Sequence, residues 1–289
     1  MSAAIKIIIF IVIYGIRELE ILNMQDRDNT SPEDGQEMDD HISSLRYAGM
    51  IQHALMPNPE ILKAYVKEYF ILFLPRDIVS GDFYYAFYNR KKLCIAIGDC
   101  TGHGVPGALM SILGISLLNE IIQSGINLRA NRILNLMREK VMKALDQKGE
   151  SADTKDSIDV ALCLIDCASG RLEFSGAGRP MYMFRNGNLT EYKADPMTIG
   201  IDPVQEKSFN NHCIETAPGD SFYIFSDGFC DQFGELTDKK FKYKRFRELI
   251  ESVQGLDMTG QKSILEKAFN DWKGKSRQVD DVIVFGFKI

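Results

Sequence analysis

The sequence predicts an α+β protein in which β-sheets pack as a sandwich and helices flank them. Runs rich in β-branched and aromatic residues recur along the chain and are broken by Gly, Asn or Asp, which is typical of strands. Short turns at Ala168 and Arg185 indicate antiparallel hairpins. Helical patterns arrive in pairs instead of after each strand, and this spacing disfavours a doubly wound parallel sheet.

The composition of the 289-residue chain is that of a globular protein with a sizeable core. A net charge of −6 without a stripe of Lys and Arg argues against a nucleic-acid partner. Most of the six cysteines lie inside apolar runs, as buried and reduced thiols of cytoplasmic proteins do. Cys163 and Cys167 form the one closely spaced pair, so we expect no structural zinc and a cytoplasmic location.

The first element is an apolar run over residues 7–16. It is shorter than the roughly 20 residues that a membrane-spanning helix needs, and its flanks do not resemble a secretory signal. Three interpretations remain open, namely the stump of a longer membrane segment, a peripheral anchor, or an element packed on the domain. The second interpretation predicts peripheral membrane contact through residues 5–16, at the inner face of the membrane.

A polar linker and an amphipathic helix precede the main domain. Residues 23–40 hold almost no apolar side chains and many turn formers, so we expect a solvated linker there. Apolar residues then recur at three- and four-residue steps from Ile42 to Leu55, up to Pro57, which predicts one helix. This helix either packs on its own domain or serves signalling and dimerisation, because periodicity fits both. The expected division is an N-terminal segment with linker at 1–36, the helix at 37–62 and the main domain at 63–289.

The main domain is expected to contain eight strands and four helices. The strands are expected at residues 65–75, 81–89, 92–99, 157–166, 171–177, 180–187, 220–227 and 281–289. Two helices are expected in series between residues 107 and 148, and two more between residues 244 and 272.

Four acidic residues stand at the ends of predicted strands. Asp82 opens a strand, Asp99 and Asp227 close two others, and Asp280 precedes the last. Carboxylates at the rim of a sheet are held by rigid backbone, and several that converge can share hard cations. A single such Asp often only caps a turn. Four together, in oxygen-only surroundings without a nearby His, favour two Mg²⁺ or Mn²⁺ ions over Zn²⁺.

The segments that carry these residues also indicate a family. DIVSGDFY, IGDCTGHGVPGALMSILG, FSDGFCDQFG and QVDDVIVFGF follow one another in this order between Leu45 and Ile289. They resemble the PPM-type metal-dependent protein serine/threonine phosphatases, in particular the SpoIIE-like branch that dephosphorylates regulatory proteins in bacteria. The resemblance implies a β-sandwich flanked by helices, and hydrolysis of phosphoserine or phosphothreonine by a water held between two Mn²⁺ or Mg²⁺ ions.

The resemblance further implies a set of metal ligands. Asp99 would bridge both cations, and the backbone carbonyl of Cys100 would contribute to one of them. Asp82 would bind the first cation, directly or through water. Asp227 and Asp280 would complete the second site.

Three other residues near these motifs have open roles. Asp281 is the alternative ligand if Asp280 does not bind. His103 could protonate the leaving serine oxygen, because an imidazole titrates near neutral pH, or it could pack in the glycine-rich loop. Arg76 could orient the phosphate by a bidentate contact, or it could be a surface residue at a strand end. We assign no role to Arg179.

The implied partner is a phosphorylated regulatory protein, such as an anti-sigma-factor antagonist in a partner-switching pathway. The resemblance also implies that the segment at residues 40–56 passes a signal and forms a homodimer. A non-catalytic member of the family, which would capture its phosphoprotein without turnover, is one rival function.

A second rival is a dinucleotide-binding oxidoreductase, because residues 102–107 (GHGVPG) fit the pattern G-x-G-x-x-G after a strand. That fold needs a second parallel strand that ends in an acidic residue, whereas one helix pattern is followed here by another. Asp99, just ahead of the loop, would also repel a pyrophosphate. The pattern therefore suits a metal loop better.

Overall fold

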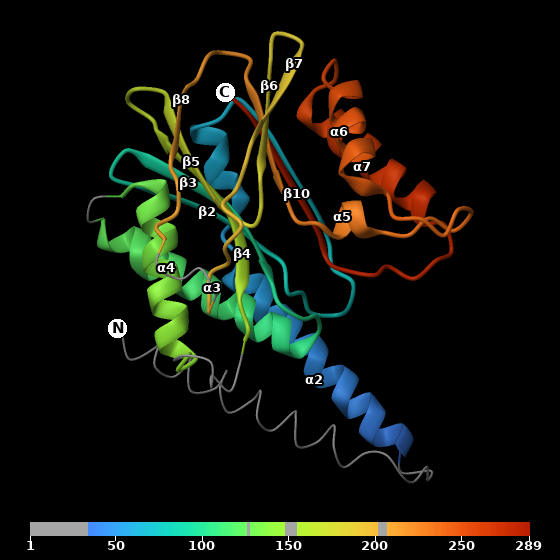
Figure 1. Ribbon diagram of the computed structural model, residues 1–289. Helices are drawn as coiled ribbons and strands as arrows, with labels where there is room; N and C mark the ends of the chain where they lie inside the picture. Colours follow the sequence, from blue (N-terminus) through green and yellow to red (C-terminus); the bar gives the residue numbers. More distant parts are fainter. Residues whose placement is uncertain (1–33, 126–127, 148–154, 202–206) are drawn as a thin grey trace.

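Two sheets pack face to face between two layers of helices (Figure 1). The computed structural model describes residues 34–125, 128–147, 155–201 and 207–289, with side chains from residue 41 onward. In spatial order, the first sheet consists of β1 (Glu68–Leu74), β10 (Val282–Lys288), β9 (Ser221–Phe225), β6 (Met181–Arg185) and β7 (Asn188–Tyr192). The second consists of β2 (Phe83–Asn89), β3 (Lys92–Cys100), β4 (Ile158–Asp166), β5 (Arg171–Ala177) and β8 (His212–Glu215). All of these strands pair antiparallel, which confirms the predicted α+β sandwich.

The first sheet is apolar on both of its faces. Successive side chains of a strand point to opposite faces, and in β9 Phe222 and Ile224 join the main core with the second sheet. Tyr223 and Phe225 belong to a separate cluster with the C-terminal helices. Because each face is covered, β9 is buried throughout its length, and its run of apolar residues is uninterrupted.

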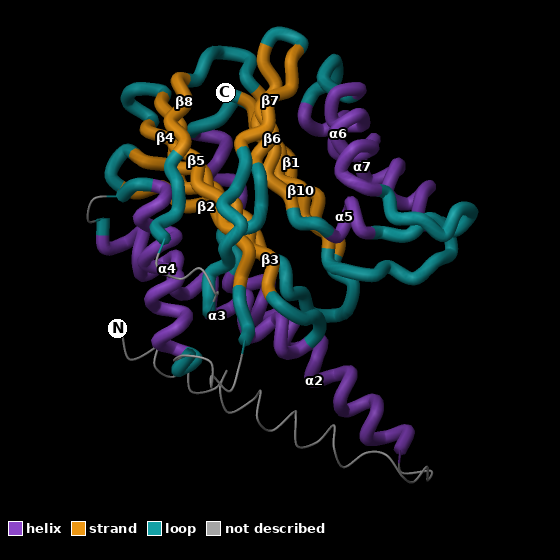
Figure 2. Tube along the Cα trace, viewed as in Figure 1, coloured by secondary structure: helices purple, strands orange, loops and turns teal. Residues whose placement is uncertain are grey.

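Helices cover the outer faces of the sandwich (Figure 2). The helices α3 (Val105–Ser124) and α4 (Ala130–Ala144) pack on the second sheet. On the side of the first sheet lie α5 (Gly228–Asp231), α6 (Lys242–Ser252) and α7 (Met258–Lys273). The two predicted helix pairs are therefore confirmed, one on each side of the molecule.

The helix α3 passes a simple test for a membrane span. Among the described residues it is the one helix that is long and apolar enough, but 61% of its apolar window is buried inside the protein. Such burial is typical of a core helix. The predicted membrane contact at residues 5–16 lies outside the described residues.

The segment before the sandwich is divided into two helices. The helix α2 (Asp34–Leu55) projects away from the sheets (Figure 1), and the 3-10 helix η1 (Pro59–Ala64) follows it. The predicted helix is thus present and ends ahead of Pro57, because proline has no backbone N–H to continue the helix. The domain boundaries at residues 36 and 62 remain predictions, and most of the predicted linker precedes the described residues.

The rival dinucleotide-binding fold does not match this topology. The strand before the GHGVPG segment is β3, which pairs antiparallel with β2 and with β4. The segment leads into α3, and α4 follows it along the chain. A parallel strand next to β3, which that fold requires, is therefore excluded by the two neighbours that β3 already has.

Candidate functional site

The four predicted aspartates meet at one end of the sandwich. Asp82 immediately precedes β2, and Asp99 is the last residue but one of β3. Asp227 lies between β9 and α5, and Asp280 lies two residues before β10. The negative charges of Asp227 and Asp280 both act on the carboxyl group of Asp99. Residues from both sheets therefore contribute to one acidic site.

Arg179 lies among these carboxylates and carries the positive charge of the site. Its Nη2 atom is 2.7 Å from an oxygen of Asp227, 2.9 Å from one of Asp99 and 3.2 Å from one of Asp159. Only 11% of the Arg179 side chain is exposed. Arg179 thus joins a carboxylate of the first sheet's rim to two carboxylates of the second sheet.

The donor atoms of the site are carboxylate and carbonyl oxygens, which are the ligands that divalent cations such as Mg²⁺ and Mn²⁺ prefer. In the described part of the chain, no three His, Cys, Asp or Glu side chains already form a metal-binding group. The oxygen donors nevertheless suit a hard cation. Asp82 is 2% exposed, and its Oδ2 atom is buried without a hydrogen-bond partner. A carboxylate oxygen in that position is unfavourable unless a cation or a donor approaches it, so the residues fit the implied metal.

Burial and mutual repulsion raise the pKa values of three carboxyl groups at this site. Burial is the main reason that the pKa of Asp82 lies well above its ordinary value, and the charge of Asp99 adds to it. The pKa of Asp99 is raised to about 7 by burial, and the Arg179 guanidinium partly opposes this shift. Burial also raises the pKa of Asp280. A bound cation would relieve this clustering of negative charge.

The two neighbours Asp280 and Asp281 have different surroundings. Both oxygens of Asp281 accept backbone hydrogen bonds at 2.7 Å, one from the N–H of Arg76 and one from the N–H of Gly81. Asp281 is 2% exposed. Asp280 accepts one hydrogen bond through Oδ1, from the backbone N–H of Asp281. Asp281 therefore holds the loops together, while Asp280 keeps an oxygen for another partner.

A glycine lets two loops of the site touch. A Cβ atom on Gly81 would lie 2.8 Å from the carbonyl oxygen of Gly102 and 3.4 Å from that of Cys100. Any larger residue at position 81 would push these segments apart. The Cys100 carbonyl, which is a predicted metal ligand, therefore lies beside the residue that precedes Asp82.

The two lower-ranked candidates, Arg76 and His103, both face Asp77 at the edge of the site. The Nη1 atom of Arg76 donates to the carbonyl of Val279 at 3.2 Å, and its Nε atom is 3.6 Å from the Asp77 carboxylate. The Nδ1 atom of His103 is also 3.6 Å from that carboxylate, and 52% of its side chain is exposed. The side-chain contacts of these two residues thus run to Val279 and Asp77, while the charge of Arg76 also acts on Asp280 and partly opposes the rise of its pKa.

Asp159 and Arg179 are two residues of the site that the sequence reasoning missed. Asp159 lies on β4 directly opposite Asp99 on β3. A Cβ atom on Gly178, whose φ is +70°, would collide with the Asp159 carboxylate. A charged residue inside the apolar run SIDVALCL was the available signal for Asp159. For Arg179, the sequence offered only an arginine in a glycine-rich turn.

Comparison of the sequence with known proteins supports the resemblance. A family model described as stage II sporulation protein E (SpoIIE) matches residues 89–289. The phosphoserine phosphatase RsbU of Bacillus subtilis (strain 168) is 23% identical over 160 residues. That alignment covers 54% of this chain and 44% of RsbU, so the chain spans less than half the length of this relative.

Solved structures show the same fold. The SiaA-PP2C domain of Pseudomonas aeruginosa is 28% identical, with a TM-score of 0.78, and the match covers 88% of this chain and 98% of that domain. The PP2C phosphatase domain of SpoIIE from Bacillus subtilis, solved with a fragment of its regulatory domain, gives a TM-score of 0.60. It is 20% identical and the match covers 77% of this chain and 63% of that one, so it supports the fold alone.

Proposed function

Because this chain belongs to the SpoIIE family of PP2C-type serine/threonine phosphatases, we propose that it hydrolyses phosphoserine or phosphothreonine on a regulatory protein with the help of two divalent cations. The observation that supports this most is the convergence of buried and half-buried carboxylates from four strand ends, one of which, Asp82, has an oxygen without a hydrogen-bond partner. An acidic site with raised pKa values is unfavourable by itself and is suited to bind cations.

The proposed ligands follow from the contacts of each residue. Asp82, Asp99 and the carbonyl of Cys100 would hold one Mn²⁺ or Mg²⁺ ion, and Asp99 would be shared with the second. Asp227 and Asp280 would complete the second site, since Asp281 already uses both oxygens on backbone N–H groups. When bound, the two cations would activate a water and stabilise the oxygens of an in-line displacement at phosphorus.

Residues around the carboxylates would position the loops of the site and the phosphate group of the substrate. Asp281 joins the loop at Arg76 to the loop at Gly81 and so fixes the approach to Asp82. Arg76 would orient the phosphate from the side of Asp77. His103, which is half exposed next to Asp77, would supply a proton to the leaving serine oxygen. Single substitutions of Arg76 and His103 test these two proposed roles, and the measurement is the turnover number of each variant.

We further propose that the substrate is an anti-sigma-factor antagonist or a similar regulator in a partner-switching pathway. The relative RsbU, a phosphoserine phosphatase by name, supports a phosphoserine protein as substrate. Cytoplasmic location, with peripheral membrane contact through residues 5–16, belongs to the same proposal. Capture of phosphorylated proteins from the source cell on the Asp99→Asn variant tests the substrate. Fractionation of cell membranes tests the location, and a chain that stays wholly in the soluble fraction would contradict membrane contact.

The helix α2 is proposed to pass a signal to the site and to form a homodimer. Gln52 of α2 is buried and donates to the Ser80 carbonyl at 2.5 Å and to the Ser111 hydroxyl at 2.7 Å. It also accepts from the Ser80 N–H at 3.0 Å. Because Ser80 lies two residues before Asp82, a movement of α2 would reach a proposed metal ligand.

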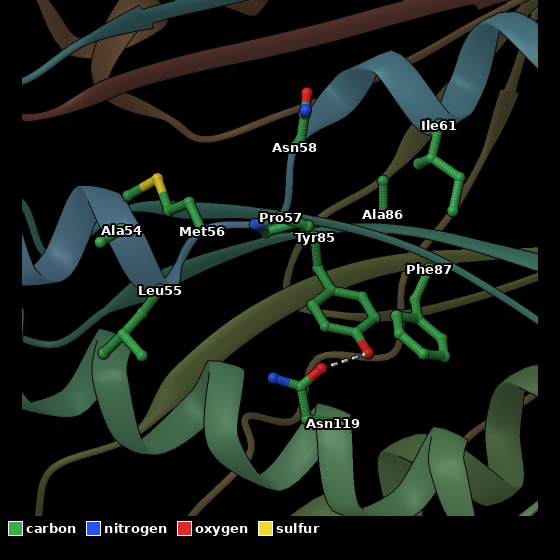
Figure 3. A pocket seen from close by; sticks show the side chains of 10 residues that line it. All are labelled: Ala54, Leu55, Met56, Pro57, Asn58, Ile61, Tyr85, Ala86, Phe87 and Asn119. Carbon is green, nitrogen blue, oxygen red and sulfur yellow. Dashed lines mark hydrogen bonds between the residues drawn. The ribbon is translucent and has the colours of Figure 1, made fainter.

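Exposed side chains of α2 offer an apolar surface for a second copy. These side chains are Tyr47 (66%), Met50 (69%), Ile51 (44%) and Leu55 (39%). Leu55 also lines a pocket of about 440 Å³, which lies between the end of α2, η1 and β2 (Figure 3). The Tyr85 hydroxyl donates to Asn119 in that pocket. Light scattering of a variant with Tyr47→Ser and Met50→Ser tests the dimer, and a parent chain that is monomeric at all concentrations would contradict it.

Phosphate release from a phosphoserine peptide in the presence of Mn²⁺ tests the proposed reaction. Asp99→Asn is expected to lower kcat/KM by on the order of a hundredfold or more, because loss of even an indirect metal partner costs about 10- to 100-fold. Asp271→Asn is the matched control, since this aspartate is 64% exposed on α7 and paired with Lys267. If the parent chain releases no phosphate with Mn²⁺, a non-catalytic binding module becomes the better description.

A further inference from the structure

Arg179 occupies the connection between β5 and β6, and it is 9% exposed. A guanidinium keeps its charge at every physiological pH, so a buried arginine needs anionic partners. In this structure the partners are the carboxylates of Asp99, Asp159 and Asp227, all within 3.2 Å of Nη2. Arg179 is therefore fixed at the centre of the site by charge.

The other hydrogen-bond donors of Arg179 are poorly satisfied. A guanidinium offers five N–H donors in a planar fork, and Nη2 makes all three carboxylate contacts. The contact of Nη1 is with the Tyr243 hydroxyl at 3.5 Å, which is long for a hydrogen bond. The Nε atom is buried without a hydrogen-bond partner. Two sides of the fork can thus take further acceptor oxygens.

A phosphate ester supplies the acceptor geometry that this fork lacks. Arginine binds phosphate oxygens in bidentate fashion, which lysine cannot do. This step rests on the proposed function. Cations held by Asp99 and Asp227 would neutralise the carboxylates that now attract Arg179, and its attraction to them would weaken. We propose that Arg179 then binds the phosphate group of the substrate and holds the ester at the carboxylate site.

Arg179 contacts the carboxylates of the site more directly than Arg76 does. The Nε atom of Arg76 is also buried without a hydrogen-bond partner, but its guanidinium contacts the Val279 carbonyl and faces Asp77. Arg179 is in direct contact with two of the proposed metal ligands. A phosphate held by cations at these ligands would therefore lie within reach of Arg179.

Binding of inorganic phosphate to the Mn²⁺-loaded protein, measured by titration calorimetry, tests this inference. Arg179→Ala is expected to weaken phosphate binding at least tenfold, while Mn²⁺ binds no more weakly than to the parent chain. Arg179→Lys is expected to recover part of the phosphate affinity, because it keeps the charge and loses the fork. With a phosphoserine peptide, the rise in KM should exceed the fall in kcat.

Arg129→Ala is the matched control, because Arg129 is 60% exposed and lies next to Glu173, away from the site. Phosphate affinity equal to that of the parent chain in Arg179→Ala would overturn the inference, and Arg179 would then serve only as a counter-ion. If Arg179→Ala does not fold, Arg179→Lys decides, and parent-like phosphate binding in that variant overturns the inference. Phosphate binding needs no turnover, so a parent chain that binds phosphate through Arg179 without hydrolysing the peptide refutes only the proposed function.

Discussion

Asp99 is a residue of the site whose protonation depends strongly on folding. Its pKa in the folded protein is raised to about 7, chiefly by burial and by the charges of Asp227 and Asp280. An aspartate in the unfolded chain titrates near 3.9. The protonated form therefore favours the folded state, and this contribution is fully present below about pH 4 and lost as the pH rises through 7.

We expect the pH dependence of stability to reflect this shift in metal-free protein. The free energy of unfolding should fall between pH 5 and pH 8, and Asp99→Asn should remove on the order of 2 kcal/mol of that fall. Urea unfolding in EDTA at both pH values measures the effect. A parent chain and an Asp99→Asn variant with the same pH dependence would show that Asp99 is not the group responsible.

Substitutions of Asp280 and of Asp281 should have different effects on metal binding and on stability. Asp281→Asn leaves one of two buried N–H groups without its charged acceptor, so we expect a loss of about 1–3 kcal/mol in the free energy of unfolding. Asp280→Asn removes a repulsive charge and should leave stability in EDTA equal or higher, while Mn²⁺ affinity falls at least about tenfold. Urea unfolding and Mn²⁺ titration on both variants provide the measurement. The opposite pattern would make Asp281 the ligand.

The sequence could identify residues whose role depends on local pattern. Asp82, Asp99, Asp227 and Asp280 stand at strand ends, and the strands could be read from their apolar runs. Arg179 could not be assigned in the same way. Its contacts join β4, the end of β3 and the turn after β9, and only the packing of the two sheets brings these segments together.

At the scale of single elements, the contact between α2 and the domain can be tested through Gln52. Gln52→Ala would leave the Ser80 N–H without its acceptor, so we expect a loss of about 1–3 kcal/mol in stability. Hydrogen exchange should increase at residues 79–82, next to Asp82. His53→Ala, at the adjacent exposed position of α2, is the matched control. Unchanged exchange at residues 79–82 in Gln52→Ala would argue against coupling between α2 and the site.

Two strands escaped prediction because of where they lie. The strands β7 and β8 each form one edge of a sheet, and their sequences NLTEY and HCIE are short and mixed in polarity. An edge strand buries little, so it carries only a weak apolar pattern. The central strands β3, β4 and β9 are buried on both faces and were predicted close to their observed ends. Burial thus decides which strands can be recognised from sequence.

At the scale of the whole molecule, the site depends on both sheets. Asp82, Asp99 and Asp159 belong to segments of the second sheet, and Asp227 and Asp280 flank strands of the first. Cation binding to these residues requires the native packing, so Mn²⁺ should stabilise the folded state. At a concentration about 100 times the dissociation constant, one such ion contributes about 2.7 kcal/mol. A melting temperature that does not change with Mn²⁺ would contradict a site shared between the sheets.

The fold class could be predicted from the sequence because the strand patterns, the hairpin turns and the paired helix patterns all indicate the same α+β sandwich. The orientation of α2 did not follow, since its periodicity fits both packing on the domain and pairing with a second chain. The structure gives α2 a domain-facing side at Gln52 and an exposed apolar side at Tyr47 and Met50. The structure therefore shows that α2 packs on its own domain, and pairing with a second chain stays a prediction.

We propose that carboxylates of both sheets hold the cations which the phosphatase reaction requires. The most direct test is to remove metal with EDTA, add Mn²⁺ back in steps, and measure bound Mn²⁺ and phosphate release on the same samples. Without Mn²⁺ we expect no phosphate release from a phosphoserine peptide. The rate of phosphate release should rise as a second Mn²⁺ ion binds to each chain. Release that continues at its full rate in EDTA would contradict a metal-dependent reaction at this site.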